Sequence, residues 1–399
     1  MTTMGSALMA QGVRAHAARW QATGRRIVLA LLLGLLPVLA LSQSIRPQTV
    51  ATGLQHPWAL AFLPQGRFLV TERPGRLRVV ETDGRVGAPV AGLPAIAAQG
   101  QGGLLDLVLD SDFVSNRVLY FCFSEPAGTG GGNSTALARA RLSEDNARLL
   151  DVRVIFSQQP KFASSAHFGC RIVEGQRDGR PDGNLFLTLG DRFRRMADAQ
   201  TLDNHHGKVV RIHKDGSVPA DNPFVARSGA RPEIWSYGHR NLQGAALAPD
   251  GQLWVHEHGP QGGDEINLPV PGRNYGWPVI TYGENYGGGK IGDGLTHRDG
   301  MEQPVHYWVP SIAPSGMVFL TSTRYGQAWR GNLFIGALAG RFLDRIEWNT
   351  EGGRTRVVRE YRLLTELGER IRDVRQGPDG LLYVLTDSAD ARLIRLLPD

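Results

Sequence analysis

One phrase recurs six times in this chain: an apolar strand, a turn built on Pro, Asp, Gly or Asn, and a second apolar strand. Such a turn between two apolar runs predicts a β-hairpin. Copies about 46 to 75 residues apart, with almost no amphipathic helix between them, are typical of β-propeller blades. The sequence therefore predicts an all-β fold, a six-bladed β-propeller, with copies beginning at Trp58, Leu104, Arg171, Leu242, Met317 and Ile371.

A closed ring of blades needs strands from both ends of the chain in one blade. The segments 48–54 and 391–399 are each suited to supply such a strand. Because no linker interrupts the repeats, residues 46–399 are predicted to form a single domain. The longest loops are expected between the third and fifth copies, where the glycine-rich stretch 284–294 is a candidate wall of a binding cleft.

Residues 1–42 have a different character. Four arginines, including the pair Arg25 and Arg26, precede the apolar run 27–41, and small residues follow it. This order is typical of a secretory signal peptide, and the apolar run is short for a membrane span. The segment is therefore predicted to be a signal peptide that directs the protein to the periplasm, with an uncleaved N-terminal anchor as the alternative.

The formal charge of +6 does not indicate nucleic acid as a partner. The four arginines near the N-terminus account for all but +2 of it, and the rest of the chain has no basic block. After export, Cys122 and Cys170 would reach an oxidising compartment where a disulfide can form. Two buried free thiols are an equal alternative.

Two segments place polar side chains just before a predicted strand. His167 and Arg171 lie at the third copy, in SSAHFGCRI, and Arg240 and Asn241 lie at the fourth, in WSYGHRNLQG. All four are then expected at one end of the ring. Histidine titrates near neutrality and suits a general base, and arginine offers a forked cation. The alternatives are a turn histidine bonded to backbone and a loop salt bridge.

The segment HEHGPQGGDEIN (256–267), with NYGWP (274–278), is a candidate metal site. Calcium prefers oxygen ligands, and a Gly/Pro turn exposes its carbonyls, with Asp264 and Glu265 nearby. His256 and His258 lie two residues apart on one strand face, which also suits zinc, although no cysteine is close. Calcium is favoured over zinc, and a purely structural turn is the third alternative.

Further arginines are expected at the same end of the ring. Gln101 precedes the second copy in GQGGLLD, and Arg370 and Arg372 alternate before the sixth in ERIRDV. Arginines that converge on a channel mouth suit a flat polyanion.

These phrases, together with LTLGDR and RIRDVRQGPDG, occur in an order that resembles the soluble quinoprotein glucose dehydrogenases. They are still more similar to the soluble aldose sugar dehydrogenases of bacterial periplasms. The resemblance extends from residue 53 to residue 387. It implies a single catalytic propeller domain that binds pyrroloquinoline quinone (PQQ), a planar tricarboxylate, with Ca2+ against the quinone.

The resemblance also implies a reaction and a role for each matching residue. His167 would take the proton from the anomeric hydroxyl of an aldose, a hydride would pass to the quinone, and a lactone would form. Arg240 would stabilise negative charge on the reduced cofactor. The cofactor-binding residues would be Gln101, Arg240, Asn241, Arg370 and Arg372. A soluble electron acceptor and a monomer or homodimer are expected.

The same resemblance assigns calcium ligands within the candidate metal site. The carbonyls of Gly259 and Pro260 match the calcium at the cofactor, where the ion would act as a Lewis acid. Glu265, with Tyr275, matches a second, structural calcium. His256 and His258 are then not expected to be ligands.

Two positions depart from the glucose enzymes. Their aspartate before the catalytic histidine is here Ala166, so another group must orient the imidazole or the base is weaker. Their cofactor-binding lysine is here Ala339, for which Arg341 is the expected substitute.

Two other functions are compatible with the blade pattern. One is a calcium-dependent propeller lactonase or esterase, which would need a carboxylate-lined central metal. The other is a non-catalytic periplasmic binding propeller. The arginine-rich mouth disfavours the first, and the joint presence of His167, Arg240 and Asn241 disfavours the second.

Overall fold

The computed structural model describes residues 44–128 and 131–399, so the predicted signal peptide lies outside the described residues. Within them, strands predominate, and no helix is long and apolar enough to cross a membrane. The helices there are α2 (Phe113–Asn116) and the 3-10 turns η1 (Pro64–Gly66), η3 (Met196–Gln200), η4 (Gln327–Trp329) and η5 (Thr365–Leu367).

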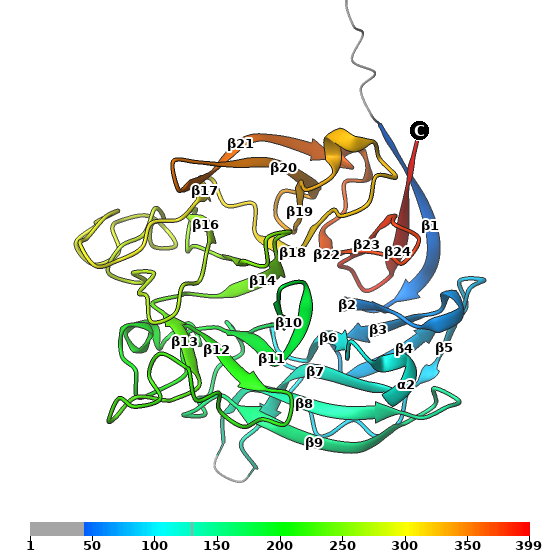
Figure 1. Cartoon of the computed structure of the whole chain (residues 1–399), viewed down its shortest axis with the longest axis horizontal. Helices are drawn as coiled ribbons and strands as arrows, with labels where there is room; N and C mark the ends of the chain where they lie inside the picture. Colours follow the sequence, from blue (N-terminus) through cyan, green and yellow to red (C-terminus); the bar gives the residue numbers. More distant parts are fainter. Residues whose placement is uncertain (1–43, 129–130) are drawn as a thin grey trace, which may run out of the picture. The chain divides into compact units, whose positions relative to one another are not determined.

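Six four-stranded antiparallel sheets surround a central axis (Figure 1), which confirms the predicted six-bladed β-propeller. Blade 1 contains β2 (Pro57–Phe62), β3 (Phe68–Glu72), β4 (Arg76–Val80) and β5 (Val86–Pro89). Blade 2 contains β6 (Leu104–Leu109), β7 (Val118–Pro126), β8 (Asn133–Leu142) and β9 (Leu149–Ser157). Blade 3 contains β10 (Gly169–Arg177), β11 (Arg180–Leu189), β12 (Lys208–His213) and β13 (Ile234–Tyr237).

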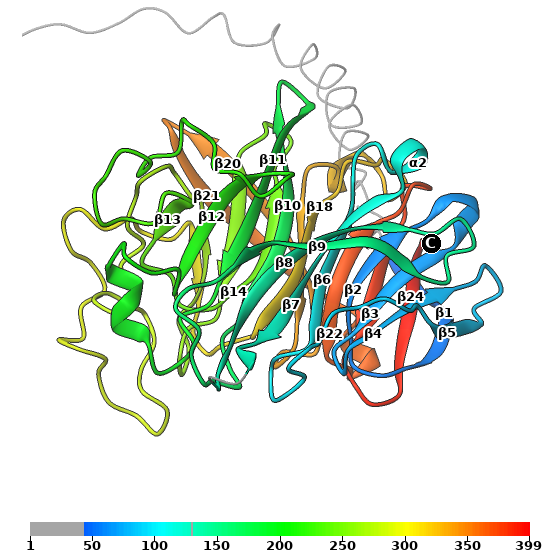
Figure 2. The same cartoon turned by 90° about the horizontal axis from the view of Figure 1, so that it is seen from below.

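The second half of the ring repeats this plan. Blade 4 contains β14 (Leu242–Leu247), β15 (Leu253–Glu257), β16 (Asp264–Asn267) and β17 (His306–Trp308). Blade 5 contains β18 (Pro314–Phe319), β19 (Leu333–Ala337), β20 (Phe342–Glu351) and β21 (Arg354–Leu363). Blade 6 contains β22 (Ile371–Gln376), β23 (Leu382–Thr386), β24 (Ala391–Pro398) and β1 (Ile45–Leu54). The long connection between β16 and β17 extends outward from blade 4 (Figure 2).

The ring closes through blade 6, as predicted. Strand β1 pairs antiparallel with β24, from Ile45 opposite Pro398 to Leu54 opposite Ala391 (Figure 1). The two ends of the propeller therefore share one sheet, in which β24 is paired on both sides and β1 forms the outer strand.

Each blade changes in character from the axis outward. The first strands of neighbouring blades contact one another around the axis. β2, with the sequence PWALAF, is buried at five of its six residues, whereas the outermost strand β21 has no fully buried residue. Strands covered on both faces are apolar almost throughout, so this gradient follows from their position in the ring.

A disulfide joins Cys122 of β7 to Cys170 of β10, with the two Cα atoms 5.8 Å apart. It therefore links blade 2 to blade 3. Both residues are fully buried. The sequence left a disulfide and two free thiols as equal alternatives, and the structure has the disulfide.

A carboxyl pair, with Asp344 buried and Glu360 half-buried, lies where blade 4 meets blade 5. Asp344 is fully buried, and neither of its carboxyl oxygens has a hydrogen-bond donor. Burial and the neighbouring charge of Glu360 raise the pKa of Asp344 to about 8. Glu360 accepts from Trp308 Nε1 at 2.9 Å and lies 3.0 Å from His306 Nε2. Asp344 is therefore protonated at neutral pH and donates toward Glu360.

We expect Asp344 to make stability depend on pH. Its pKa is higher in the folded protein than in the unfolded chain, so the unfolding free energy falls as pH rises from about 4 to about 8. Asp344→Asn removes this dependence. The unfolding free energy of the variant minus that of wild type should therefore increase across that pH interval and stay constant above it. Urea unfolding at pH 5, 7 and 9 would measure it. The control is Asp178→Asn, at an exposed turn. The prediction is contradicted if the difference in unfolding free energy between Asp344→Asn and wild type does not change with pH.

Candidate functional site

The predicted site residues meet at one end of the propeller because the first strands of the blades all start there. Gln101 precedes β6, His167 precedes β10, Arg240 and Asn241 precede β14, and Arg370 precedes β22. A pocket of about 220 Å3 at this end is lined by Gln101, Asn241, Arg370 and Arg372. An adjoining cavity of about 550 Å3 is lined by His167 and shares Gln101.

His167 is held in one orientation by a buried aspartate. Its Nδ1 lies 2.6 Å from Oδ1 of Asp191, and both side chains are at most 5% exposed. Burial lowers the pKa of His167, and the hydrogen bond and charge of Asp191 act in the opposite direction. His167 also donates its backbone N–H to Gln101 Oε1 at 2.8 Å. The imidazole is thus a neutral base whose Nδ1 proton is directed at Asp191.

Asp191 was missed in the sequence, although it stands in the quoted phrase LTLGDR. It occupies the turn after β11, and the β10–β11 hairpin returns it to His167. Its carboxylate also accepts from Phe193 N and from Trp277 Nε1, each at 2.8 Å. Burial alone would raise its pKa, but His167, the charge of Arg240 and the Phe193 N–H keep the pKa of Asp191 below its ordinary value. Asp191 therefore supplies the orienting group that Ala166 cannot.

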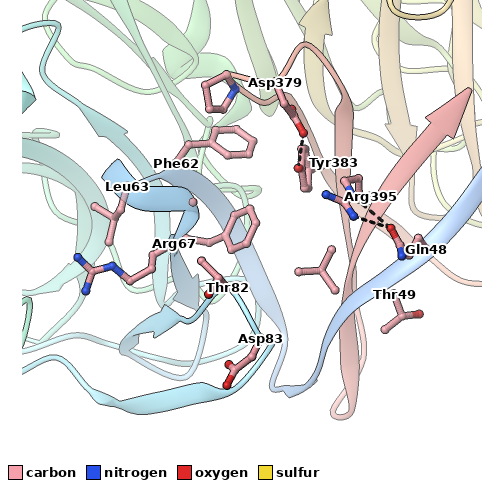
Figure 3. Close-up of a pocket in the computed structure, with 14 residues that line it drawn as sticks. Gln48, Thr49, Phe62, Leu63, Arg67, Thr82, Asp83, Asp379, Tyr383 and Arg395 are labelled. Atoms are coloured by element: carbon pink, nitrogen blue, oxygen red, sulfur yellow. Dashed lines mark hydrogen bonds between the residues drawn. The ribbon is translucent and has the colours of Figure 1, made fainter.

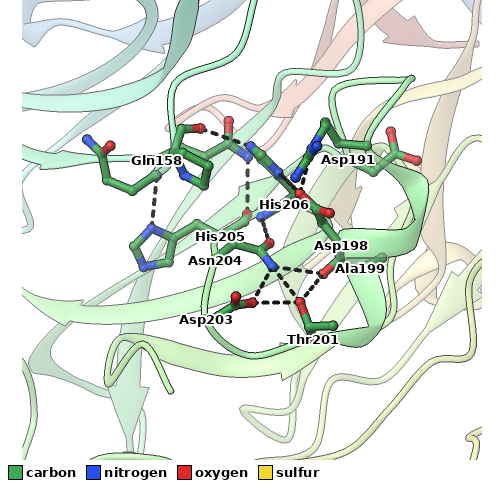
Figure 4. A network of polar contacts seen from close by, with 12 residues as sticks. Gln158, Asp191, Asp198, Ala199, Thr201, Asp203, Asn204, His205 and His206 are labelled. Atoms are coloured by element: carbon green, nitrogen blue, oxygen red, sulfur yellow. Dashed lines mark hydrogen bonds and ion pairs between the residues drawn. The ribbon is translucent and has the colours of Figure 1, made fainter. Parts of the chain in front are cut away.

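The loop that follows Asp191 is fixed by a polar network (Figure 4). Gln158 donates to the carbonyl of Gly190 at 2.9 Å and to that of His205 at 3.1 Å. His206 Nδ1 lies 2.7 Å from Asp198 Oδ2. The buried ammonium of Lys208 donates to the carbonyls of Asp198 and His206. These contacts hold the backbone on both sides of the loop, so Asp191 stays in place.

Arg240 joins the base to the candidate metal segment. The carbonyl of Arg240 accepts from Asp191 N at 2.8 Å. Its Nη1 donates to the carbonyls of His258 and Gly259 at 3.0 and 2.7 Å. Asn241 Oδ1 accepts from Gly169 N at 3.2 Å. Arg240 and Asn241 thus lie between the His167 turn and the Gly259 turn.

Arg370 and Arg372 share a carboxylate at the pocket. Arg372 lies 2.7 Å and Arg370 3.7 Å from Oδ2 of Asp387. Burial would raise the pKa of Asp387, but Arg372, His56 and Arg370 lower it to about 2. The structure does not bring Arg341 into this set. Arg341 is exposed, has φ 56° in the β19–β20 turn, and donates to the carbonyl of Gly368 at 3.2 Å.

Glu265 lies in an electrostatically unfavourable place. Burial and the nearby charge of Glu257 raise the pKa of Glu265 to about 8. Asn267 Nδ2 lies between the two carboxylates, 3.1 Å from each, and its Oδ1 is buried without a partner. An extra cation would relieve the carboxylate repulsion and satisfy this oxygen. Tyr275 stacks on His239 nearby, with ring centroids 4.6 Å apart.

The described residues contain no group of three or more His, Cys, Asp or Glu side chains that could hold a metal ion. A site here would therefore depend on carbonyls such as those of Gly259 and Pro260. Both ring nitrogens of His256 are buried without a partner, and His258 Nε2 donates to the Pro314 carbonyl at 2.7 Å. These contacts do not gather the two imidazoles around one ion, which disfavours zinc.

Two exposed aromatic rings border the His167 cavity. Phe193 is 45% exposed, and its ring meets the His167 ring edge-on at 5.1 Å. Tyr286, from the glycine-rich stretch, is 63% exposed and accepts from Arg240 Nη2 at 3.3 Å. The buried guanidinium of Arg192 lies 3.7 Å from the Phe168 ring and bonds the carbonyls of Ser164 and His167. Arg192 thereby holds the turn that presents Phe193 to solvent.

Another cavity, of about 490 Å3, lies between blades 6 and 1 (Figure 3). Phe62, Phe68 and Tyr383 line it, with Tyr383 bonded to Asp379 and Arg395 bonded to Gln48. It adjoins the β2–β3 and β22–β23 turns, which lie at the opposite end of those strands from the His167 site. No residue of the His167 site takes part in it.

The fold and site together define a propeller with a buried His–Asp base beside an arginine-lined pocket. The chain belongs to the Glucose / Sorbosone dehydrogenase family, whose model matches residues 54–395. It is 46% identical over 374 residues to the aldose sugar dehydrogenase YliI of Escherichia coli, covering 91% of this chain and 98% of the relative. It is 28% identical over 426 residues to quinoprotein glucose dehydrogenase B of Acinetobacter calcoaceticus, covering 88% and 87%.

Solved structures agree with this assignment. The apo form of the soluble aldose sugar dehydrogenase from Escherichia coli superposes with a TM-score of 0.82 at 44% identity, covering 89% of this chain and all of that one. The PQQ-bound form of an aldose sugar dehydrogenase from Streptomyces coelicolor gives 0.71 at 28% identity, covering 90% and 99%. The resemblance to the soluble quinoprotein glucose dehydrogenases is thereby confirmed.

Asp191→Asn should lower the pKa of His167 further, because the carboxylate raises that pKa against the effect of burial. Imidazole 15N shifts followed against pH would measure the change. Asp198→Asn is the matched control, since Asp198 pairs with His206 in the same loop. An unchanged or higher pKa of His167 in Asp191→Asn would show that the pair does not set its protonation.

Proposed function

We propose that this protein oxidises the anomeric hydroxyl of aldose sugars to lactones, with PQQ as the electron acceptor and Ca2+ as the metal. The observation that carries the proposal is the buried His167–Asp191 pair facing a cavity that shares Gln101 with an arginine-lined pocket. We also propose export to the periplasm, reoxidation by a soluble electron acceptor, and a monomer or homodimer.

The residues of the smaller pocket fit a planar tricarboxylate. Arg370 and Arg372 supply guanidinium groups that suit carboxylates, and Gln101 and Asn241 supply amides. The walls include Trp58 and Phe168, which suit a flat ring system. PQQ bound here would supply a two-electron acceptor next to the cavity that holds His167.

The residues near Arg240 also fit calcium. The carbonyls of Gly259 and Pro260 are the proposed ligands beside the cofactor, where Ca2+ would polarise the acceptor. Glu265, with Tyr275, is the proposed second site. The unpartnered Asn267 Oδ1 and the raised pKa of Glu265 support a cation there.

His167 would act as the general base. Its Nδ1 hydrogen bond to Asp191 leaves Nε2 with a lone pair for the anomeric hydroxyl proton. Loss of that proton would make the anomeric carbon a better hydride donor, PQQ held in the neighbouring pocket would supply the acceptor for the hydride, and the sugar would leave as the lactone. The imidazolium that results is stabilised by the Asp191 carboxylate. The Arg240 guanidinium, which donates to the Gly259 carbonyl, would stabilise negative charge on the reduced cofactor.

The alternative of a calcium-dependent lactonase requires free carboxylates on the propeller axis. The axial carboxylates Asp106 and Asp373 are instead each paired with Arg171 and with Arg375. Neither is available for a metal without breaking a buried ion pair. This arrangement supports the sugar dehydrogenase over the lactonase.

Reconstitution tests the proposed function. The protein from about Gln43 onward would be stripped of metals and then given Ca2+ and PQQ together and separately, with dye reduction followed across a panel of aldoses. We expect activity only when both are present. If activity is absent and the PQQ spectrum does not change on mixing, the proposal is wrong.

His167→Ala should lower turnover by at least about a hundredfold, as expected for a lost general base. PQQ binding, followed by absorbance, should be unchanged because His167 does not line the smaller pocket. His297→Ala is the control, at an exposed position on the β16–β17 connection. Near-normal turnover in His167→Ala would remove His167 from the chemistry.

Glu265→Gln should reduce the calcium-dependent gain in stability. In chelator the variant is expected to be at least as stable as wild type, because it removes repulsion with Glu257. Added Ca2+ should then raise the Tm of wild type and raise that of the variant less. Glu284→Gln, exposed on the same connection, is the control. Equal calcium shifts in both proteins would show that Glu265 is not a ligand.

A further inference from the structure

We propose that Arg73 is a carboxylate-binding residue for the cofactor, in the role that the sequence assigned to Arg341. The assignment rests on the proposed function, because it concerns the same pocket. Three guanidinium groups and one carboxylate line that pocket, and Arg341 is not among them.

Arg73 is fixed at the pocket by its backbone and its side chain. It follows β3, and its N–H donates to the carbonyl of His56 at 3.0 Å, while its carbonyl accepts from Leu104 N at 3.2 Å. A Cβ at Gly103 would lie only 1.8 Å from that carbonyl, so the Gly103 turn packs directly on Arg73. The guanidinium donates through Nη1 to the carbonyl of Gly100, beside Gln101.

The charges at the pocket do not balance. Three guanidinium groups line it, from Arg73, Arg370 and Arg372, and Asp387 is the one carboxylate among the described residues that line it. Arg372 and Arg370 are within 4.0 Å of Asp387. Arg73 forms no ion pair within that distance to any described carboxylate. It is therefore a cation at the pocket that no described protein carboxylate neutralises.

The environment of Arg73 favours an anionic ligand. Burial lowers the pKa of Arg73, Asp387 raises it, and the like charge of Arg372 lowers it. A bound carboxylate would offset both the burial and the repulsion. A partly buried guanidinium also forms charge-assisted hydrogen bonds that are stronger than those between neutral groups.

Arg341 is not placed for this role. Its backbone lies in the left-handed region, its side chain is exposed, and its Nη1 donates to the carbonyl of Gly368. It is absent from the lining of the pocket, as is Ala339. Arg73 is therefore the residue that compensates for the missing lysine.

Direct binding of PQQ tests the role of Arg73 without relying on activity. The protein would first be stripped of metals and then saturated with Ca2+ before PQQ is added. Kd would be measured by absorbance titration for wild type, Arg73→Gln, Arg73→Lys and Arg341→Gln. We expect Arg73→Gln to weaken binding by at least about tenfold, Arg73→Lys to weaken it less, and Arg341→Gln to leave it within about twofold. Binding by Arg73→Gln should also depend less steeply on salt than binding by wild type.

Three results would overturn the assignment. Wild-type affinity in Arg73→Gln would show that Arg73 is not a ligand. Equal weakening in Arg73→Gln and Arg341→Gln would show that only net charge matters. If wild type itself does not bind PQQ, both the proposed function and the role of Arg73 are wrong. If wild type and Arg73→Gln bind PQQ equally well, the proposed function stands and only the role of Arg73 is wrong. Arg73→Lys retains the charge, and its PQQ affinity tests the role of Arg73 if Arg73→Gln does not fold.

Discussion

The propeller depends on a buried cluster of four charges on its axis. Arg171 of blade 3 pairs with Asp106 of blade 2 and Asp373 of blade 6, and Arg375 pairs with the same two carboxylates. The cluster also receives the Leu60 N–H of blade 1, uses the Gln243 carbonyl of blade 4, and packs on Gly316 of blade 5. All six blades therefore meet at one point. Removing one member would leave the other three with a net buried charge that nothing in the cluster balances, which costs about 3–5 kcal/mol.

The same cluster places the chemistry of the site. Arg171 follows His167 by four residues, Asp106 follows Gln101 by five, and Asp373 comes directly after Arg372. Gln101, His167 and Arg372 thus stand at the start of first strands that also carry the charges of the axial cluster. The loops can differ in length between blades without moving these side chains, because their positions are set by the strands that follow them. This explains how irregular repeats still produce a single compact site.

The sequence was sufficient for the fold and for the parts of the site that lie just before first strands. The repeat determined the blades, and residues such as Gln101 and Arg370 meet because all first strands begin at one end. Asp191 could not be found this way, since it follows a second strand and reaches His167 only through the hairpin register. Arg341 is absent from the pocket lining for a related reason, since it lies in the β19–β20 turn and not before a first strand. Its left-handed backbone conformation is a feature that no periodicity in the sequence reveals.

The site carries two opposite charge imbalances in the protein alone. The pocket mouth has more guanidinium groups than carboxylates, whereas Glu257 and Glu265 bring two carboxyl groups to Asn267, which raises the pKa of Glu265. Each imbalance costs folding free energy, and each is of the sign that one proposed ligand would neutralise: an anionic quinone in the first case and a divalent cation in the second. Partial burial explains why these costs persist in the folded protein, since solvent screens groups such as the half-exposed Arg370 only in part. The proposed binding of a tricarboxylate and a metal accounts for both imbalances.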